Sequence, residues 1–318
     1  MNELVKFLFD GLPVRGMVVR LTEAWQEVLR RRGTVGENPP EVRSLLGEMA
    51  AAGVLMHANI KFNGALVMQI HGDGPVKLAV AEVQPDLAFR ATATVVGAVP
   101  AGADLAGLLN VRGKGRCAIT LDPLERIPGQ QPYQGVVSLH GGHREPLQHL
   151  SQVLEHYMLQ SEQLDTRLVL AADDHIAAGL LIQRLPAQGA GNLGGPRNED
   201  DIGVSEGFNR IALLAATLTR EELLALSTER ILHRLFWEEP LHVFEPLQPR
   251  FACTCSRDRV RGMLQSLGQA ESDSLIRERG MVEVGCEFCG LQYRFDAVDV
   301  GEMFTPAGKQ PPGSSLLN

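Results

Sequence analysis

Four cysteines near the C-terminal end constrain this chain more than any other feature. They form two close pairs, Cys253-Thr254-Cys255 and Cys286-Glu287-Phe288-Cys289, with thirty residues between the pairs. Zinc takes four tetrahedral ligands and thiolates suit it, and a two-residue spacing is typical of a turn that wraps a metal. Unrelated buried thiols would not be paired in this way. The pattern therefore predicts a metal site.

The same cysteines allow a second chemistry after oxidation. Sequence neighbours can close as disulfides, and four cysteines allow three connectivities. A zinc-bound thiolate can be oxidised to a sulfenic acid that condenses with its neighbour, and the metal is then lost. Residues 249–305 form a unit of roughly 55 residues, for which a core alone is marginal. Metal-binding energy is folding energy in such a unit, so oxidation is expected to unfold it.

Composition excludes several classes of protein. The chain has 318 residues, which suggests about two domains. Its net charge of −8 and its 5% aromatic content argue against a chain-wide nucleic-acid surface. No apolar run is long enough to span a bilayer, and Lys6 and Asp10 interrupt the N-terminal apolar stretch, so no signal peptide is expected. We therefore expect a soluble cytoplasmic protein with reduced cysteines.

Residues 1–186 are predicted to form an α+β core domain. The hydrophobic periodicity predicts helices over 21–32, 42–57 and 147–160. Strands are predicted over 65–70, 76–83, 90–96, 116–121, 133–139, 167–171 and 176–185. Short strands with helices grouped apart favour an α+β fold over a doubly wound sheet.

Residues 187–248 are predicted to be a flexible helical linker. The stretch 186–207 is rich in glycine and contains the acidic run 199–201, which suggests a mobile loop. Helical periodicity resumes over 208–237, where Thr219 and Glu222 have the spacing of a capping box. We interpret these short helices as a weakly anchored connector. A small zinc-binding domain at 249–305 and a disordered tail at 306–318 complete the predicted organisation.

Beyond the cysteines, several further segments match those of one known family, in order, over about residues 3–305. They include Val14-Arg15-Gly16, Lys61-Phe62-Asn63-Gly64, Gly72-Asp73-Gly74-Pro75, Tyr133-Gln134-Gly135-Val136-Val137, Ser161-Glu162-Gln163-Leu164, Glu221-Glu222-Leu223-Leu224, Cys253-Thr254-Cys255-Ser256-Arg257 and Cys286-x-x-Cys289-Gly290. On these segments the chain resembles the heat-shock protein 33 family of redox-regulated 33 kDa chaperonins.

The resemblance implies an ATP-independent holdase and not an enzyme. Cys253, Cys255, Cys286 and Cys289 would bind one zinc ion in an inactive reduced form. Oxidation would form the disulfides Cys253–Cys255 and Cys286–Cys289, release zinc, unfold the zinc unit and loosen the linker. The active form would be a homodimer that binds unfolded or oxidatively damaged clients. Client binding and dimerisation would fall to the core domain.

Two other functions fit parts of the sequence. A zinc ribbon that binds nucleic acid or modifies RNA could use a small basic cluster formed by Arg250, Arg257, Arg259 and Arg261. A zinc enzyme is disfavoured because four cysteine ligands leave no open coordination position. The apolar linker helices could bind clients or could pack on the core domain. We hypothesise that they cover its sheet in the reduced form.

Several other residues favour structural interpretations. Cys117 is expected to be a buried, inert thiol in a strand. His140 and His143 are expected in a solvated loop, and Asp173-Asp174-His175 in a hairpin turn. Gly113-Lys114-Gly115 lacks the spacing of a phosphate-binding loop, which agrees with an ATP-independent activity.

Overall fold

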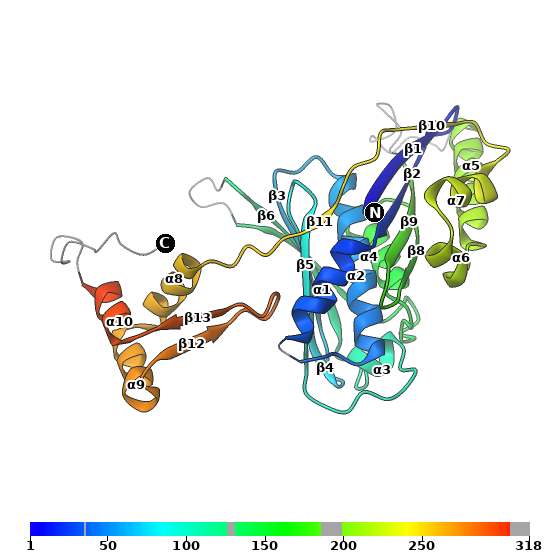
Figure 1. Ribbon diagram of the computed structural model, residues 1–318. Helices are drawn as coiled ribbons and strands as arrows, with labels where there is room; N and C mark the ends of the chain where they lie inside the picture. Colours follow the sequence, from blue (N-terminus) through cyan, green and yellow to red (C-terminus); the bar gives the residue numbers. More distant parts are fainter. Residues whose placement is uncertain (35, 126–130, 186–198, 306–318) are drawn as a thin grey trace. The chain divides into compact units, whose positions relative to one another are not determined.

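The computed structural model describes residues 1–34, 36–125, 131–185 and 199–305 (Figure 1). The chain divides into two compact units, Met1–Ala252 and Cys253–Asn318. The expected tail at 306–318 and the expected mobile loop as far as residue 198 lie outside the described residues. Within the described ranges, no helix is long and apolar enough to cross a membrane.

The first unit contains a five-stranded antiparallel sheet in the order β10-β1-β2-β9-β8. Its strands are β1 (Glu3–Phe9), β2 (Val14–Leu21), β8 (Thr166–Ala172), β9 (Ala177–Arg184) and β10 (Leu241–Val243). The edge strand β10 comes from the segment that follows the linker helices and pairs with β1, as Figure 1 shows.

A second sheet has six strands in the order β11-β5-β4-β3-β6-β7. These are β3 (Gly64–His71), β4 (Val76–Val83), β5 (Ala88–Val95), β6 (Arg116–Pro123), β7 (Tyr133–Ser138) and β11 (Arg250–Phe251). All neighbours are antiparallel except β11, which runs parallel to β5. Both sheets thus take an edge strand from residues 241–251.

Helices join the two sheets into one core. They are α1 (Glu23–Gly33), α2 (Pro40–Asn59), α3 (Leu105–Leu109) and α4 (Leu150–Ser161). Helix α2 contacts strands of both sheets, and thirteen of its residues are buried. This position explains why the second half of α2 is almost entirely apolar, because a helix between two sheets is covered on most of its sides. The predicted α+β class is confirmed.

The other face of the five-stranded sheet is covered by the linker helices α5 (Glu199–Ala216), α6 (Arg220–Ala225) and α7 (Thr228–Phe236). Their apolar side chains join Phe7, Phe9 and strand residues of β2, β8 and β9 in a separate buried cluster. The interpretation as a weakly anchored connector is therefore wrong. The predicted capping box of Thr219 and Glu222 is confirmed at the start of α6.

The acidic run 199–201 also differs from its prediction. These residues open α5 and are not part of a loop. Because the preceding stretch is rich in glycine, the sequence placed the start of this helix at residue 208, nine residues too late.

Strands β1 and β2 were not predicted, because their hydrophobic pattern does not alternate. Met17, Val19 and Leu21 face the helix-filled core between the sheets, whereas Val14 and Val18 face the linker helices. A strand that is buried on both faces has a nearly continuous apolar sequence, which does not distinguish it from a helix.

The second unit is small and is built around a hairpin. It contains α8 (Arg257–Leu267), α9 (Gln269–Arg279), β12 (Val282–Gly285), β13 (Gln292–Phe295) and α10 (Ala297–Phe304). Among the residues described up to 305, its hydrophobic cluster has six buried members, namely Leu264, Val282, Tyr293, Phe295, Val300 and Met303. So small a core gives little stability without a further crosslink.

Candidate metal centre

Two local structures position the four cysteines. Cys253 and Cys255 lie on the irregular segment before α8, whose N-cap is Ser256. Cys286 and Cys289 lie in the turn between β12 and β13. The Gly290 N–H donates to the Cys286 carbonyl at 2.8 Å, and Gly290 has a φ of +72°, which glycine adopts without strain. From this turn the Cys286 thiol reaches the Cys253 thiol and the Cys289 thiol reaches the Cys255 thiol.

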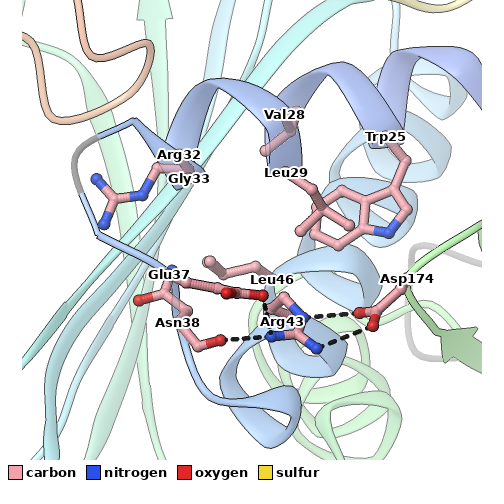
Figure 2. Close-up of a pocket in the computed structure, with 10 residues that line it drawn as sticks. All are labelled: Trp25, Val28, Leu29, Arg32, Gly33, Glu37, Asn38, Arg43, Leu46 and Asp174. Carbon is pink, nitrogen blue, oxygen red and sulfur yellow. Dashed lines mark hydrogen bonds and ion pairs between the residues drawn. The ribbon is translucent and has the colours of Figure 1, made fainter.

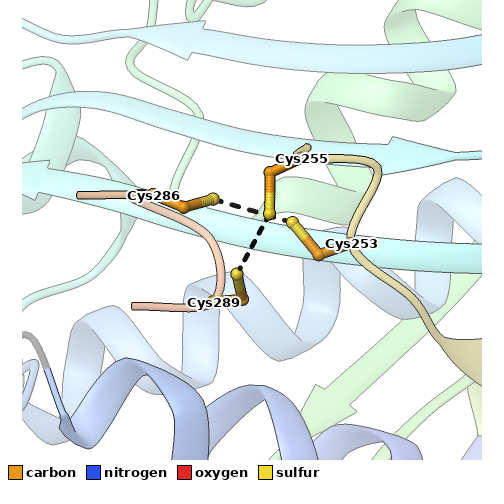
Figure 3. Close-up of side chains that lie close together, drawn as sticks. All are labelled: Cys253, Cys255, Cys286 and Cys289. Carbon is orange, nitrogen blue, oxygen red and sulfur yellow. Dashed lines mark hydrogen bonds between the residues drawn. The ribbon is translucent and has the colours of Figure 1, made fainter. Parts of the chain in front are cut away.

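The structure brings the four predicted residues together (Figure 3). All four Sγ atoms lie within 4.8 Å of one another, with separations of 3.6 Å for Cys253–Cys286 and 3.4 Å for Cys255–Cys289. Zinc–sulfur bonds of about 2.3 Å in a tetrahedron place sulfurs about 3.8 Å apart. The thiols therefore fit a tetrahedral metal ion without a change of fold. All five cysteines of the chain are thiols.

Without a bound cation, the surroundings of the four cysteines favour the neutral thiol over the charged thiolate. Burial raises the pKa of Cys286 and that of Cys289 above the usual thiol value. The Tyr293 hydroxyl donates a hydrogen bond to Cys255 Sγ at 3.2 Å. A divalent cation reverses this balance, because it deprotonates the thiols that coordinate it. Tyr293 was missed by the sequence analysis, since nothing in its spacing marks it as a neighbour of Cys255.

Three of the four arginines of the predicted basic cluster have polar partners within their own unit. Arg250 pairs with Asp86 in the first unit. In the second unit, Arg257 pairs with Asp299 at 2.8 Å and lies over the Phe295 ring, while Arg259 donates to the Thr254 hydroxyl. Arg257 and Arg259 therefore stabilise the structure around the thiols.

The other residues singled out in the sequence have structural roles. Cys117 is fully buried in β6, as expected, and burial raises its pKa to about 12; that the thiol is inert stays a prediction. His140 and His143 lie in the loop after β7. The N–H groups of Arg112 and Lys114 donate to the Asp73 carboxylate, which holds the Gly113 loop.

Asp173, Asp174 and His175 form the predicted turn between β8 and β9. Asp174 accepts two hydrogen bonds from Arg43, at 2.7 and 2.8 Å, beside a cavity of about 220 Å³ (Figure 2). The same guanidinium donates to the Asn38 carbonyl at 2.7 Å. Asp174 thus ties this turn to the start of α2.

Polar contacts that the sequence did not reveal hold the linker on the core. Arg20 of β2 donates to the carbonyls of Leu223 and Leu224 in α6. Arg220 of α6 donates to the Ala172 carbonyl and lies 3.7 Å from the largely buried Glu48 carboxylate. Together with the apolar cluster, these contacts join α6 to both α2 and β8.

The first unit has a two-sheet core with a docked helical linker, and the second is a small unit with four thiols. Comparison with known proteins shows which class of protein has this organisation. The family model described as Hsp33 protein matches residues 2–296, which include all four cysteines. The chain is 46% identical over 303 residues to the 33 kDa chaperonin of Chromobacterium violaceum, covering 95% of this chain and 94% of that protein. It is 40% identical over 300 residues to the 33 kDa chaperonin of Neisseria meningitidis serogroup B, covering 94% and 90%.

The chain therefore belongs to the Hsp33 family. The crystal structure of the 33 kDa chaperonin from Thermotoga maritima is similar in fold, with a TM-score of 0.74 at 20% identity over 95% of this chain and 98% of that one. Family membership makes the protein a molecular chaperone and not an enzyme, and it implies that client proteins bind to it.

Proposed function

We propose that this protein is an ATP-independent holdase, and that the four cysteines control its activity by binding zinc when reduced and by forming disulfides when oxidised. The observation that carries the proposal is the convergence of four thiols at tetrahedral spacing in a unit with a six-residue core. Cys253, Cys255, Cys286 and Cys289 would hold one zinc ion, which contributes the crosslink that this unit otherwise lacks. Four thiols that must stay reduced also support a cytoplasmic location.

Oxidation would remove the ligands in pairs. With peroxide, two zinc-bound thiolates give one disulfide, and their two electrons together with two protons from solvent convert the peroxide to two waters, so the four thiolates use two peroxides. We propose the pairs Cys253–Cys255 and Cys286–Cys289. Sulfur atoms of the two segments also come as close as 3.4 and 3.6 Å in the reduced fold. Once the unit loosens, however, cysteines that are close in sequence remain close, because short loops cost little entropy to close.

Loss of zinc would unfold the second unit and loosen the linker that directly precedes it. The linker helices cover an apolar sheet face that includes Phe7, Val18 and Ile182. An exposed patch of this kind is what a chaperone needs for unfolded clients, and a covered one keeps the protein from aggregating. We also propose that the active form is a homodimer and that nucleic acid is not a partner.

Light scattering from a heat-aggregating client tests the proposal. The protein is compared in reductant with zinc and after peroxide treatment at mild heat. Suppression of aggregation only by the oxidised form is the expected result. Equal suppression by both forms would mean that the cysteines do not control the activity, and salt-dependent binding to nucleic acid with zinc retained would favour the zinc-ribbon alternative.

A further inference from the structure

The outer edge of β1 is occupied by a short segment of this chain, residues 240–247, which we call the strap. The strap contains β10 and runs antiparallel to β1. Outside the β10 ladder, main-chain hydrogen bonds of 2.8–3.0 Å join Asp10 to Pro240, Lys6 to Phe244, and Leu4 to Leu247 in both directions. Pairing therefore continues along nearly the whole of β1.

Of the strap's large apolar side chains, only Leu241 packs against the buried cluster beneath the linker helices. Val243 is 49% exposed, Phe244 42% and Leu247 41%. The side chains of Phe7 and Phe9 on β1, by contrast, are buried in the sheet. The strap is thus held mainly by its backbone, and any extended peptide carries the same backbone groups.

Departure of the strap would leave β1 as an apolar edge strand with unpaired N–H and C=O groups. Such an edge is a template for another extended chain. A groove of about 310 Å³ runs beside it, and Val5 and Leu232 would remain as its apolar wall. Glu3 and Glu229 also line this groove, so its charge favours a segment with basic residues.

We propose that the edge of β1 binds an extended segment of an unfolded client as an added strand, in the place that the strap occupies. Recognition would come from main-chain hydrogen bonds, and so would depend little on the client's sequence. The inference rests on the proposed function, in which oxidation loosens the linker. Only five residues separate Leu247 from Cys253, so the strap lies next to the first cysteine along the chain.

A peptide and its backbone-methylated analogue test this mode of binding. The probe is a short fluorescent peptide of alternating valine and threonine with lysine at each end, and binding to the oxidised protein is followed by anisotropy. N-methylation of the probe backbone keeps its side chains but removes its donors, and should weaken binding by about tenfold or more. Equal affinity of the two peptides would refute strand addition. If the oxidised protein still suppressed aggregation, the proposed function would stand.

Variants of the strap test the site without oxidation. Phe244→Pro removes the N–H that donates to the Lys6 carbonyl, and should raise the affinity of the reduced protein for the probe by about tenfold. Phe244→Ala removes only the side chain. Glu245→Pro changes a residue whose N–H has no main-chain partner among the described residues. Both controls should bind the probe like the wild type.

Hydrogen exchange shows whether the strap has opened in the Phe244→Pro variant. Exposed strap amides without a gain in probe affinity would overturn the proposal. So would a Phe244→Pro variant that dimerises in sedimentation and excludes the probe, because a second copy would then be the occupant. Protected strap amides with higher probe affinity would place the binding elsewhere and would also overturn it.

Discussion

Phe236→Ala should make the reduced protein partly active, because this side chain fixes α7 to the sheet. Phe236 is 1% exposed, and its ring centroid lies 5.0 Å from that of Phe9 and 6.0 Å from that of Phe7. Truncating a buried phenylalanine costs about 3–5 kcal/mol. The equilibrium between docked and undocked α7 should therefore shift by roughly two to four powers of ten.

The neighbouring aromatic residue supplies a matched control. Trp237 is 69% exposed, so Trp237→Ala removes a larger ring at almost no cost in buried area. Both variants are compared in reductant with zinc. Hydrogen exchange reports the protection of α5–α7, and light scattering from a heat-aggregating client reports the activity. Phe236→Ala should lose protection in α7 and suppress aggregation, whereas Trp237→Ala should do neither.

Two outcomes would contradict this reasoning. If α7 stayed protected in Phe236→Ala, the aromatic cluster would not be what holds the helix. If α7 lost its protection and aggregation were not suppressed, the surface beneath the linker would not be the client surface. Unfolding of the whole first unit is recognised separately, because the amides of β3–β6 would then exchange as well.

Three further predictions concern other groups. Burial raises the pKa of Glu48 to about 7 against the opposing influence of Arg220, so its contribution to stability is fully present below about pH 4.5 and is lost as the pH rises through 7. The loss is about 3 kcal/mol at most; urea unfolding from pH 5 to 8 should show it, and Glu48→Gln should flatten the slope. Chelation, or Cys286→Ser, should abolish amide protection over 257–304 and leave β2 and β9 protected; retained protection in α8–α10 would show that zinc is not required for folding. Cys117, with its pKa raised to about 12, should resist alkylation in the native protein, and Cys117→Ala should respond to peroxide like the wild type.

The sequence predicted those parts of the molecule whose signals are local. The spacing of the cysteines predicted their convergence, since each pair is positioned by its own short segment. The turn Gly72-Asp73-Gly74 separated β3 from β4, and the capping box of Thr219 marked the start of α6. In each case, the residues that determine the structure lie within a few positions of one another.

Contacts between distant segments could not be predicted in this way. Arg220 lies near Glu48 because the linker helix α6 folds back onto α2. The sequence around either residue gives no indication of this contact. The strap pairs with β1 through backbone atoms, which every residue has, so residues 240–247 carry no side-chain signal for the pairing. Even the apolar character of β2 was ambiguous, because two layers of helices cover its sheet.

Simultaneous measurement of thiol state, zinc release and client protection in one sample tests the central claim most directly. The reduced, zinc-loaded protein is treated with peroxide at mild heat, and free thiols, released zinc and light scattering are followed together. The account predicts that four of the five thiols disappear, that one zinc ion is released per chain, and that aggregation is suppressed only as zinc appears. Full suppression of aggregation while zinc remains bound and the thiols remain reduced would contradict it.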